Sequence, residues 1–150
     1  MKSIFVAAAM LVAAPVALAQ VAVSDAWIRG TVAHQTATGA FMQLVAERDG
    51  RLVEANSPAA AQVEIHEMRM ENDVMRMRRI DALPLPAGKQ VVLQPGGFHL
   101  MLTGLKAPLR EGDKVPLSLV FQADGQAPQT VRLDVPVRAL HGKGGLGHGR

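Results

Sequence analysis

The sequence predicts an all-β domain, folded as an antiparallel sandwich or a Greek-key barrel. Many short segments of strand character follow one another along the chain, and turn residues separate them at regular intervals. After residue 20, no stretch has both the length and the 3.6-residue periodicity of a long amphipathic helix. This combination is typical of β-sandwiches and small barrels.

The first seven predicted strands lie upstream of residue 105. Each is an apolar or alternating segment that ends at residues favouring turns. The segments are residues 21–28, 40–46, 52–55, 62–70, 74–80, 91–93 and 98–102. The turn residues that separate them include Asp49-Gly50, Ser57-Pro58, Asn72-Asp73 and Pro95-Gly96-Gly97.

The two clearest strands come last. In residues 131–137, Val and Leu alternate with Arg, Asp and Pro, which is the period of a half-buried strand. Residues 115–121 have the same alternation, and Asp124-Gly125 marks the turn between the two segments. Pro136 cannot donate a backbone hydrogen bond, so we expect its strand at the edge of a sheet.

The N-terminal segment reads as a secretory signal peptide. Lys2 precedes an apolar run over residues 4–12, and Ala17-Leu18-Ala19 forms a small-x-small cleavage site. Pro15 interrupts the run, which is shorter than the roughly 20 apolar residues of a membrane-spanning helix. We therefore expect cleavage after Ala19, export, and no stable membrane insertion.

The remaining chain divides into residues 20–138, which we expect to form the folded domain, and residues 139–150, a Gly-rich tail with two histidines. The formal net charge is only +3 and the basic residues are scattered. With one Trp, four Phe and no Tyr to stack on bases, the chain is not expected to bind nucleic acid. Nothing in the sequence requires more than a monomer.

Four soft metal ligands form the most informative motif. His66 is followed after ten residues by Met77, and after another twenty-one by His99 and Met101. Imidazole suits several transition metals, whereas hard cations do not select a neutral thioether sulfur, so the set points to copper and most naturally to Cu(I). The chain has no cysteine, which excludes thiolate ligands, lipidation at cysteine and a blue-copper electron carrier. Its serines lie in no recognisable nucleophile motif, so we expect a carrier rather than an enzyme.

Strand parity brings the first two ligands together. Side chains alternate faces along a strand, and residues 62–70 and 74–80 read as the arms of a hairpin. A turn at residues 71–72 would place His66 directly opposite Met77. A turn at residues 72–73 would place Met68 opposite Met77, with His66 as the diagonal neighbour. In both registers His66 and Met77 lie on one face within reach of a shared ion.

The other two ligands, His99 and Met101, are two residues apart and therefore share a face of their own strand. Two such pairs on adjacent strands can close a four-coordinate site at the surface. Met68, Met70 and Met75 lie in the same hairpin among charged neighbours, an unusual place to bury methionine. They could form an ordinary hydrophobic stripe, but we interpret them as transfer or entry residues.

The spacing His-x10-Met-x21-His-x-Met resembles the signature of the periplasmic copper chaperone family PCu(A)C. Further agreement with that family lies in the segments Asp25-Ala26-Trp27-Ile28-Arg29, Val63-Glu64-Ile65-His66-Glu67 and Pro95-Gly96-Gly97-Phe98-His99-Leu100-Met101-Leu102, and in residues 104–113. The resemblance extends over nearly all of residues 21–137.

The resemblance implies a cupredoxin-like β-barrel with one Cu(I) ion held by His66, Met77, His99 and Met101. It also implies delivery of copper in the periplasm to the CuA centre of cytochrome c oxidase, directly or with a thioredoxin-like chaperone. The tail resembles the His-containing extensions of some members, which are linked to Cu(II). Because it offers only His141 and His148, and no Met, any Cu(II) site there should be weak.

Two other functions remain open from the sequence. The protein could be a periplasmic copper buffer or resistance protein without a dedicated acceptor. It could also be a metal-free β-sandwich binding module in which the His and Met positions are coincidental. Cu(I) titration separates the second alternative from the carrier, and copper transfer to an acceptor separates the first.

Overall fold

The computed structural model describes residues 20–139, and in this range the chain forms strands and no helix. The strands are β1 Val21–Arg29, β2 Ala37–Ala46, β3 Gly50–Asn56, β4 Ala60–Glu71, β5 Val74–Ile80, β6 Leu83–Leu85, β7 Gln90–Leu93, β8 His99–Leu105, β9 Lys114–Ala123 and β10 Gln129–Arg138. The predicted signal peptide and the histidines of the tail, His141 and His148, lie outside the described residues. Within those residues, no helix is long and apolar enough to cross a membrane.

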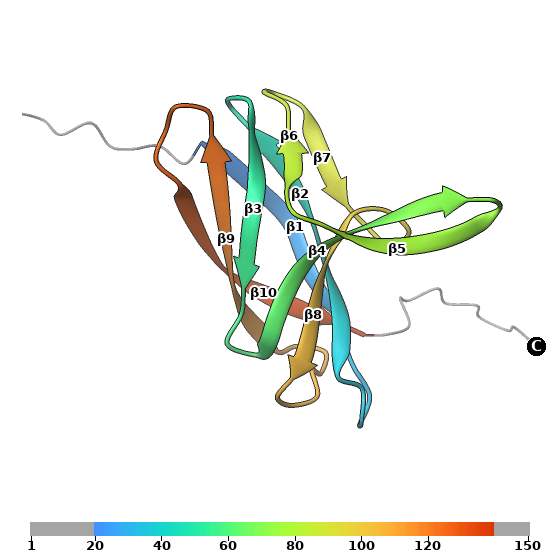
Figure 1. The fold of residues 1–150 in the computed structure, drawn as a ribbon. Coiled ribbons are helices and arrows are strands. Elements are labelled where there is room, and N and C mark those ends of the chain that lie inside the picture. The colour runs from blue at the N-terminus through green and yellow to red at the C-terminus, as the bar shows by residue number, and fades with distance from the viewer. Residues whose placement is uncertain (1–19, 140–150) are drawn as a thin grey trace, which may run out of the picture.

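The strands close into a barrel (Figure 1). The hydrogen-bonded order is β4-β8-β2-β1-β10-β9-β3, and β3 returns to β4 through the pair Ala55 and Val63. β1 and β10 run parallel, while the other neighbours in this ring are antiparallel. β5, β6 and β7 pair outside the ring with β4, β3 and β2. The all-β Greek-key prediction is therefore confirmed.

Two details differ from the sequence prediction. β6 was not predicted, because three residues around Pro84 carry no periodic pattern, yet the strand pairs with β3. β10 lies between β9 and β1, so the edge position predicted from Pro136 is wrong. The pairing of β10 with β1 begins at Val137, one residue after the proline, so it does not depend on the missing N–H.

The hydrophobic core fills the inside of the barrel and comes from all of the ring strands. On β8, Leu100 and Leu102 are fully buried in this core, as predicted, and alternation turns His99 and Met101 to the outer face. Met42 is also a core residue, with 1% of its surface exposed. The barrel thus holds β4 and β8 side by side with their His and Met residues on the outside.

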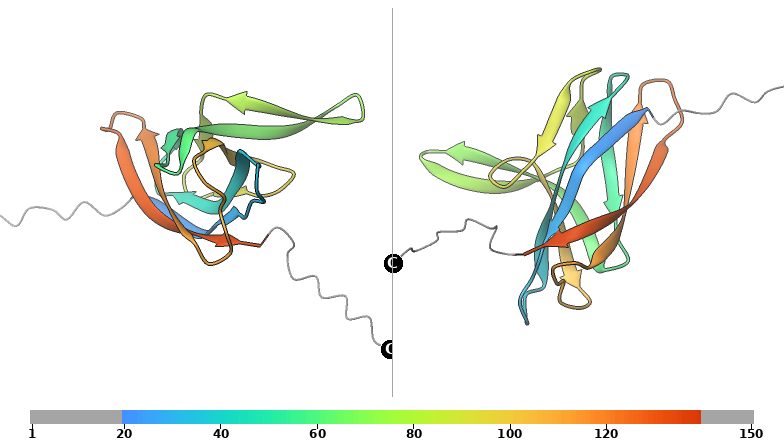
Figure 2. Two further views of the ribbon diagram at one scale, coloured as in Figure 1. Left: turned by 90° about the horizontal axis from the view of Figure 1, so that it is seen from below. Right: turned by 180° about the vertical axis from the view of Figure 1, so that it is seen from behind.

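The β4–β5 hairpin projects from the barrel (Figures 1 and 2). Its turn consists of Asn72 and Asp73, both with positive φ (50° and 61°). A two-residue turn with positive φ at both positions matches the twist of a hairpin, and Asn and Asp tolerate that conformation well. Met68 consequently pairs with Met77. Of the two registers left open by the sequence, the turn at residues 72–73 is the correct one.

Candidate metal centre

The centre of the site is a pair of histidines on neighbouring strands. His66 of β4 lies directly opposite His99 of β8, and their ring centroids are 5.6 Å apart. One step along the same face, Glu64 lies opposite Met101. The i and i+2 spacing predicted from the sequence therefore places both histidines and Met101 on one outer surface.

Met77 reaches this surface from β5. Its Sδ lies 3.2 Å from Nε2 of His99, while Nδ1 of His99 lies 3.1 Å from the carbonyl oxygen of Gly97. A carbonyl only accepts hydrogen bonds, so the ring proton belongs on Nδ1 and Nε2 carries a free lone pair. Two lone-pair donors, one nitrogen and one sulfur, thus face each other, which is an arrangement that a soft cation can bridge.

In His66 the two ring nitrogens have the opposite roles from those in His99. Its Nε2 lies 2.8 Å from Oε2 of Glu64, and this hydrogen bond lowers the pKa of the Glu64 carboxyl below its ordinary value. Its Nδ1 is buried and has no hydrogen-bond partner in the described structure. Buried polar atoms are almost always partnered, and metal-binding histidines commonly donate their other N–H to a carboxylate. The orphaned Nδ1 fits a metal ligand.

Met101 joins the site through a cavity of about 150 Å³. Met68, His99 and Met101 line it together with residues of β2 and the turn before β8. His99 is only 6% exposed, whereas Met77 is 51% exposed. The predicted surface site is therefore open on the Met77 side and buried at His99.

An aromatic layer covers the buried side. Phe41 lies over Gly39, where an added Cβ would come within 2.7 Å of the Phe41 Cζ atom, and its ring is 6.3 Å from that of His99. Trp27 packs on Phe41 at 4.6 Å, and the guanidinium of Arg29 lies 5.4 Å from the Phe41 ring. Burial lowers the pKa of His99, so its ring stays neutral, the form that binds metals.

Sequence reasoning missed three contributors to this site. Glu64 had a detectable signal, because it shares a face with His66 at i+2 spacing. Met68 was assigned only a transfer role, although its register opposite Met77 was one of the two predicted possibilities. Phe41 had no local signal, since its contact with His99 depends on the pairing of β2 with β8.

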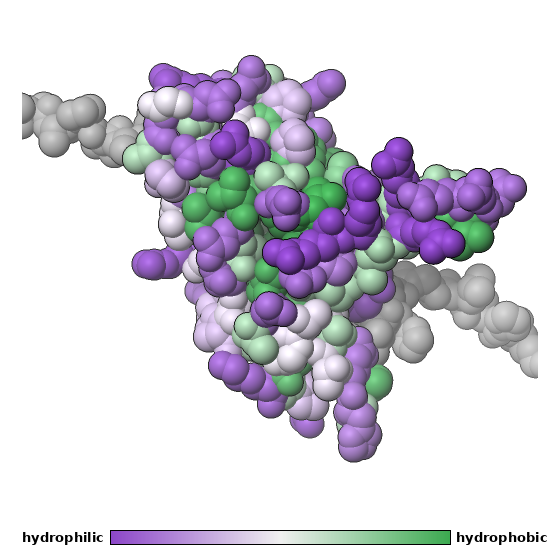
Figure 3. Space-filling model, viewed as in Figure 1, coloured by the Kyte–Doolittle hydropathy of each residue, from purple (hydrophilic) through white to green (hydrophobic). Residues whose placement is uncertain are grey.

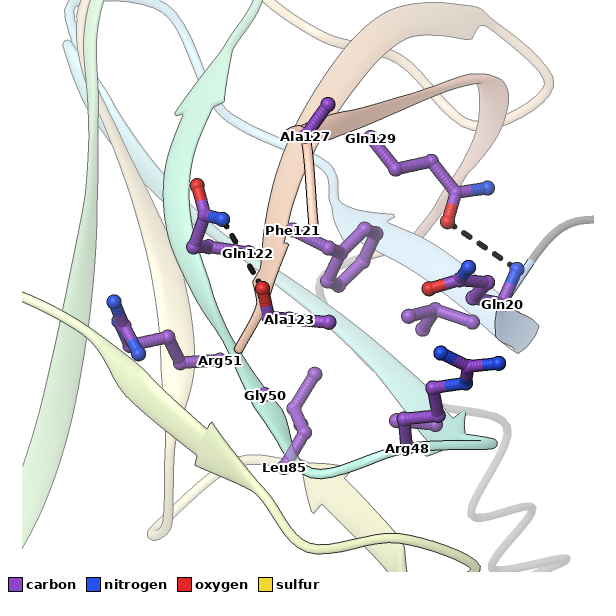
Figure 4. A pocket seen from close by; sticks show the side chains of 12 residues that line it. Gln20, Arg48, Gly50, Arg51, Leu85, Phe121, Gln122, Ala123, Ala127 and Gln129 are labelled. Atoms are coloured by element: carbon purple, nitrogen blue, oxygen red, sulfur yellow. Dashed lines mark hydrogen bonds between the residues drawn. The ribbon is translucent and has the colours of Figure 1, made fainter. Parts of the chain in front are cut away.

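Other candidates lie apart from the cluster. His34 occupies the exposed turn between β1 and β2, with a φ of 70°. A second cavity, shown in Figure 4, lies at the far end of β2 and measures about 20 Å³. Its lining includes Gln20, Phe121 and Gln129 but neither His nor Met, and it has room for about one water molecule. Among residues 20–139, no group of three His, Cys, Asp or Glu suits a metal, so the candidate centre depends on thioethers.

Comparison with known protein families assigns the chain to one of them. Residues 21–137 match the family described as "Putative lipoprotein LpqE-like". The chain belongs to this LpqE-like family. A relative in Leifsonia xyli subsp. xyli (strain CTCB07), "Putative lipoprotein Lxx21020", is 33% identical over 123 residues, which are 81% of this chain and 72% of that protein.

Solved structures of PCuAC domains share the fold of this LpqE-like protein. The apo PCuAC domain of PmoF2 has a TM-score of 0.66 at 26% identity, with 84% of this chain and 95% of that domain covered. Cu(I)-bound DR1885 from Deinococcus radiodurans has a TM-score of 0.57 at 26% identity, with 82% and 79% covered. The copper-bound PmoF2 domain has a TM-score of 0.62 at 23% identity, with 82% and 97% covered. These matches confirm the predicted cupredoxin-like barrel and the resemblance to PCu(A)C proteins.

Proposed function

We propose that this protein is a periplasmic Cu(I) carrier that holds one ion with His66, Met77, His99 and Met101. The observation that carries the proposal is the approach of Met77 Sδ to Nε2 of His99, at 3.2 Å. The orphaned Nδ1 of His66 supplies a second imidazole donor on the same surface. Met101 completes the set from the cavity that it shares with His99.

The donor chemistry favours Cu(I). Thioethers are soft ligands, and all four proposed ligands are neutral. A site built from them therefore stabilises Cu(I), with its single positive charge, better than Cu(II). Two structural relatives support the choice of metal, because one PmoF2 domain is copper-bound and DR1885 is solved with Cu(I).

The site suits transport better than catalysis. Met77 is half exposed, so an incoming ligand of an acceptor can replace its thioether while the buried His99 still holds the ion. Release then requires only an acceptor with higher affinity, without a conformational change. The acceptor we propose is the CuA centre of cytochrome c oxidase, reached directly or through a thioredoxin-like chaperone. The lipoprotein names of the family and its relative agree with an exported protein.

Anaerobic titration with Cu(I) against a competing chelator tests the site. We expect one tight equivalent, weakened in His99→Ala and in Met101→Ala, whereas His34→Ala in the exposed turn should bind as the wild type does. An unchanged affinity in the His66→Ala, Met77→Ala double variant would remove the basis of the assignment. A chain without any tight equivalent would be a metal-free binding module.

Transfer separates a carrier from a buffer. The Cu(I)-loaded protein is mixed with an isolated, copper-free CuA domain, and copper on each partner is measured after separation. The proposal expects copper to move to the CuA domain. Retention of a tightly bound ion in the presence of that acceptor would instead identify a copper buffer.

A further inference from the structure

The methionines of the β4–β5 hairpin form two pairs across the strands. Met68 lies opposite Met77, and Met70 lies opposite Met75. Because side chains alternate and antiparallel partners point the same way, both pairs lie on the face that carries His66. Four thioethers thus extend outward from the candidate metal centre towards the hairpin tip.

The outer pair is unusually exposed for such apolar side chains. Met70 is 60% exposed and Met75 is 44% exposed, whereas core Met42 is 1% exposed. No core residue is supplied by the tip of this hairpin, which projects from the barrel (Figure 2). Packing within the described chain therefore does not explain the outer pair.

The other face of the hairpin is charged. Glu67 forms an ion pair with Arg78, and Glu71 forms one with Arg76. Hydrophilic residues cover most of the projecting hairpin on the side seen in Figure 3. Methionine is thus confined to one face of a charged ribbon, which is the pattern expected when the sulfur atoms have their own role.

The spacing of the pairs suits a mobile soft ion. Two residues of strand span about 7 Å, so each methionine pair lies that distance from the next position on the same face. Directly opposed side chains have Cβ atoms about 5 Å apart, close enough for two thioethers to hold one ion. The inner residue Met68 also lines the cavity with His99 and Met101, so the row of thioethers is continuous with the candidate centre.

We propose that Met70 and Met75 form a second, weaker Cu(I) site, from which the ion reaches the main centre through Met68 and Met77. The proposal rests on the proposed function for its direction of travel. In each step a thioether of one pair replaces a thioether of the previous pair, so one Cu–S bond forms as another breaks. Copper remains Cu(I) throughout, and no proton or electron is exchanged.

The test uses the protein with ¹³C-labelled methionine methyl groups, titrated anaerobically with Cu(I) and followed by NMR. The first equivalent should shift the methyl signals of Met77 and Met101. Further Cu(I) should shift those of Met70 and Met75 together, in fast exchange. Signals of the outer pair that stay unchanged in excess Cu(I), while the main site is filled, would overturn the proposal.

The Met70→Leu, Met75→Leu variant separates ligand chemistry from apolar contact, because leucine keeps the size and loses the sulfur. We expect the first equivalent to bind with unchanged affinity, the second event to disappear, and loading of the main centre from a Cu(I)–chelator complex to slow several-fold. Val74→Leu, an exposed substitution at the same tip, is the matched control and should change nothing. Equal loading rates in the double variant and the wild type would rule out the route.

The proposed main site and the proposed outer site would fail in different ways. Loss of the main site would appear as a missing tight equivalent and unshifted Met77 and Met101 signals. The outer site is read from its own methyl groups, so their response decides it whether or not the main centre loads.

Discussion

At the residue scale, the two histidines present different nitrogens. A carbonyl at Gly97 places the proton of His99 on Nδ1, and the carboxylate of Glu64 places that of His66 on Nε2. The atoms left with free lone pairs are Nε2 of His99 and Nδ1 of His66. Such partners orient a ring and raise its basicity, so Glu64 should matter although it is not itself a proposed ligand.

Glu64→Ala should therefore weaken Cu(I) binding by about 10–100-fold, the usual cost of losing a partner behind a ligand. Glu64→Gln keeps a carbonyl acceptor for the ring N–H and should lose less. Chelator competition measures both affinities, and long-range ¹H–¹⁵N spectra of the metal-free protein report the tautomers. Exposed Glu54→Gln is the control. An Nδ1–H tautomer of His66 in the wild type would contradict the assignment.

At the element scale, the hairpin and β8 explain why so much of the site could be predicted from the sequence. Alternation alone placed His99 and Met101 on one face, and a tight turn around Asn72 limited the hairpin to two registers. The pairing of strands far apart in sequence could not be predicted in this way. The contact of Phe41 with His99 and the parallel pairing of β1 with β10 both depend on segments far apart in sequence.

Gly39→Ala tests the aromatic layer. The new Cβ would lie 2.7 Å from Phe41 Cζ, so the ring must move. Overpacking of this kind costs about 1–3 kcal/mol of unfolding free energy, measurable by denaturant titration. Gly97→Ala is the matched control, because a Cβ added at Gly97 would come no closer than 3.5 Å to its nearest neighbour, Cγ of Gln94. Equal stability of the two variants would show that Phe41 is not held over Gly39.

At the scale of the whole molecule, the barrel core and the candidate metal centre are separate. The apolar cluster lies inside the ring of strands, while the His and Met side chains lie on its outer face. The chain has no disulfide to add stability, because it has no cysteine. The barrel should therefore fold without copper, and the ion should add stability by binding the native state alone.

Cu(I) should raise the thermal midpoint of the protein. At a free concentration 100 times the dissociation constant, binding to the native state adds about 2.7 kcal/mol, less any binding to the unfolded chain. Anaerobic thermal unfolding monitored by circular dichroism measures the shift. Mg²⁺, which prefers oxygen ligands, is the control and should cause none. A midpoint that Cu(I) leaves unchanged would contradict a native copper site.

The central claim is that imidazole and thioether bind one Cu(I) together at the junction of β4, β5 and β8. X-ray absorption at the copper K edge of the complex with one equivalent of Cu(I) tests it most directly. The account predicts a Cu(I) edge with both sulfur and imidazole nitrogen bound to the metal, and a loss of sulfur in the Met77→Leu, Met101→Leu variant. A first coordination shell of nitrogen and oxygen alone would contradict it.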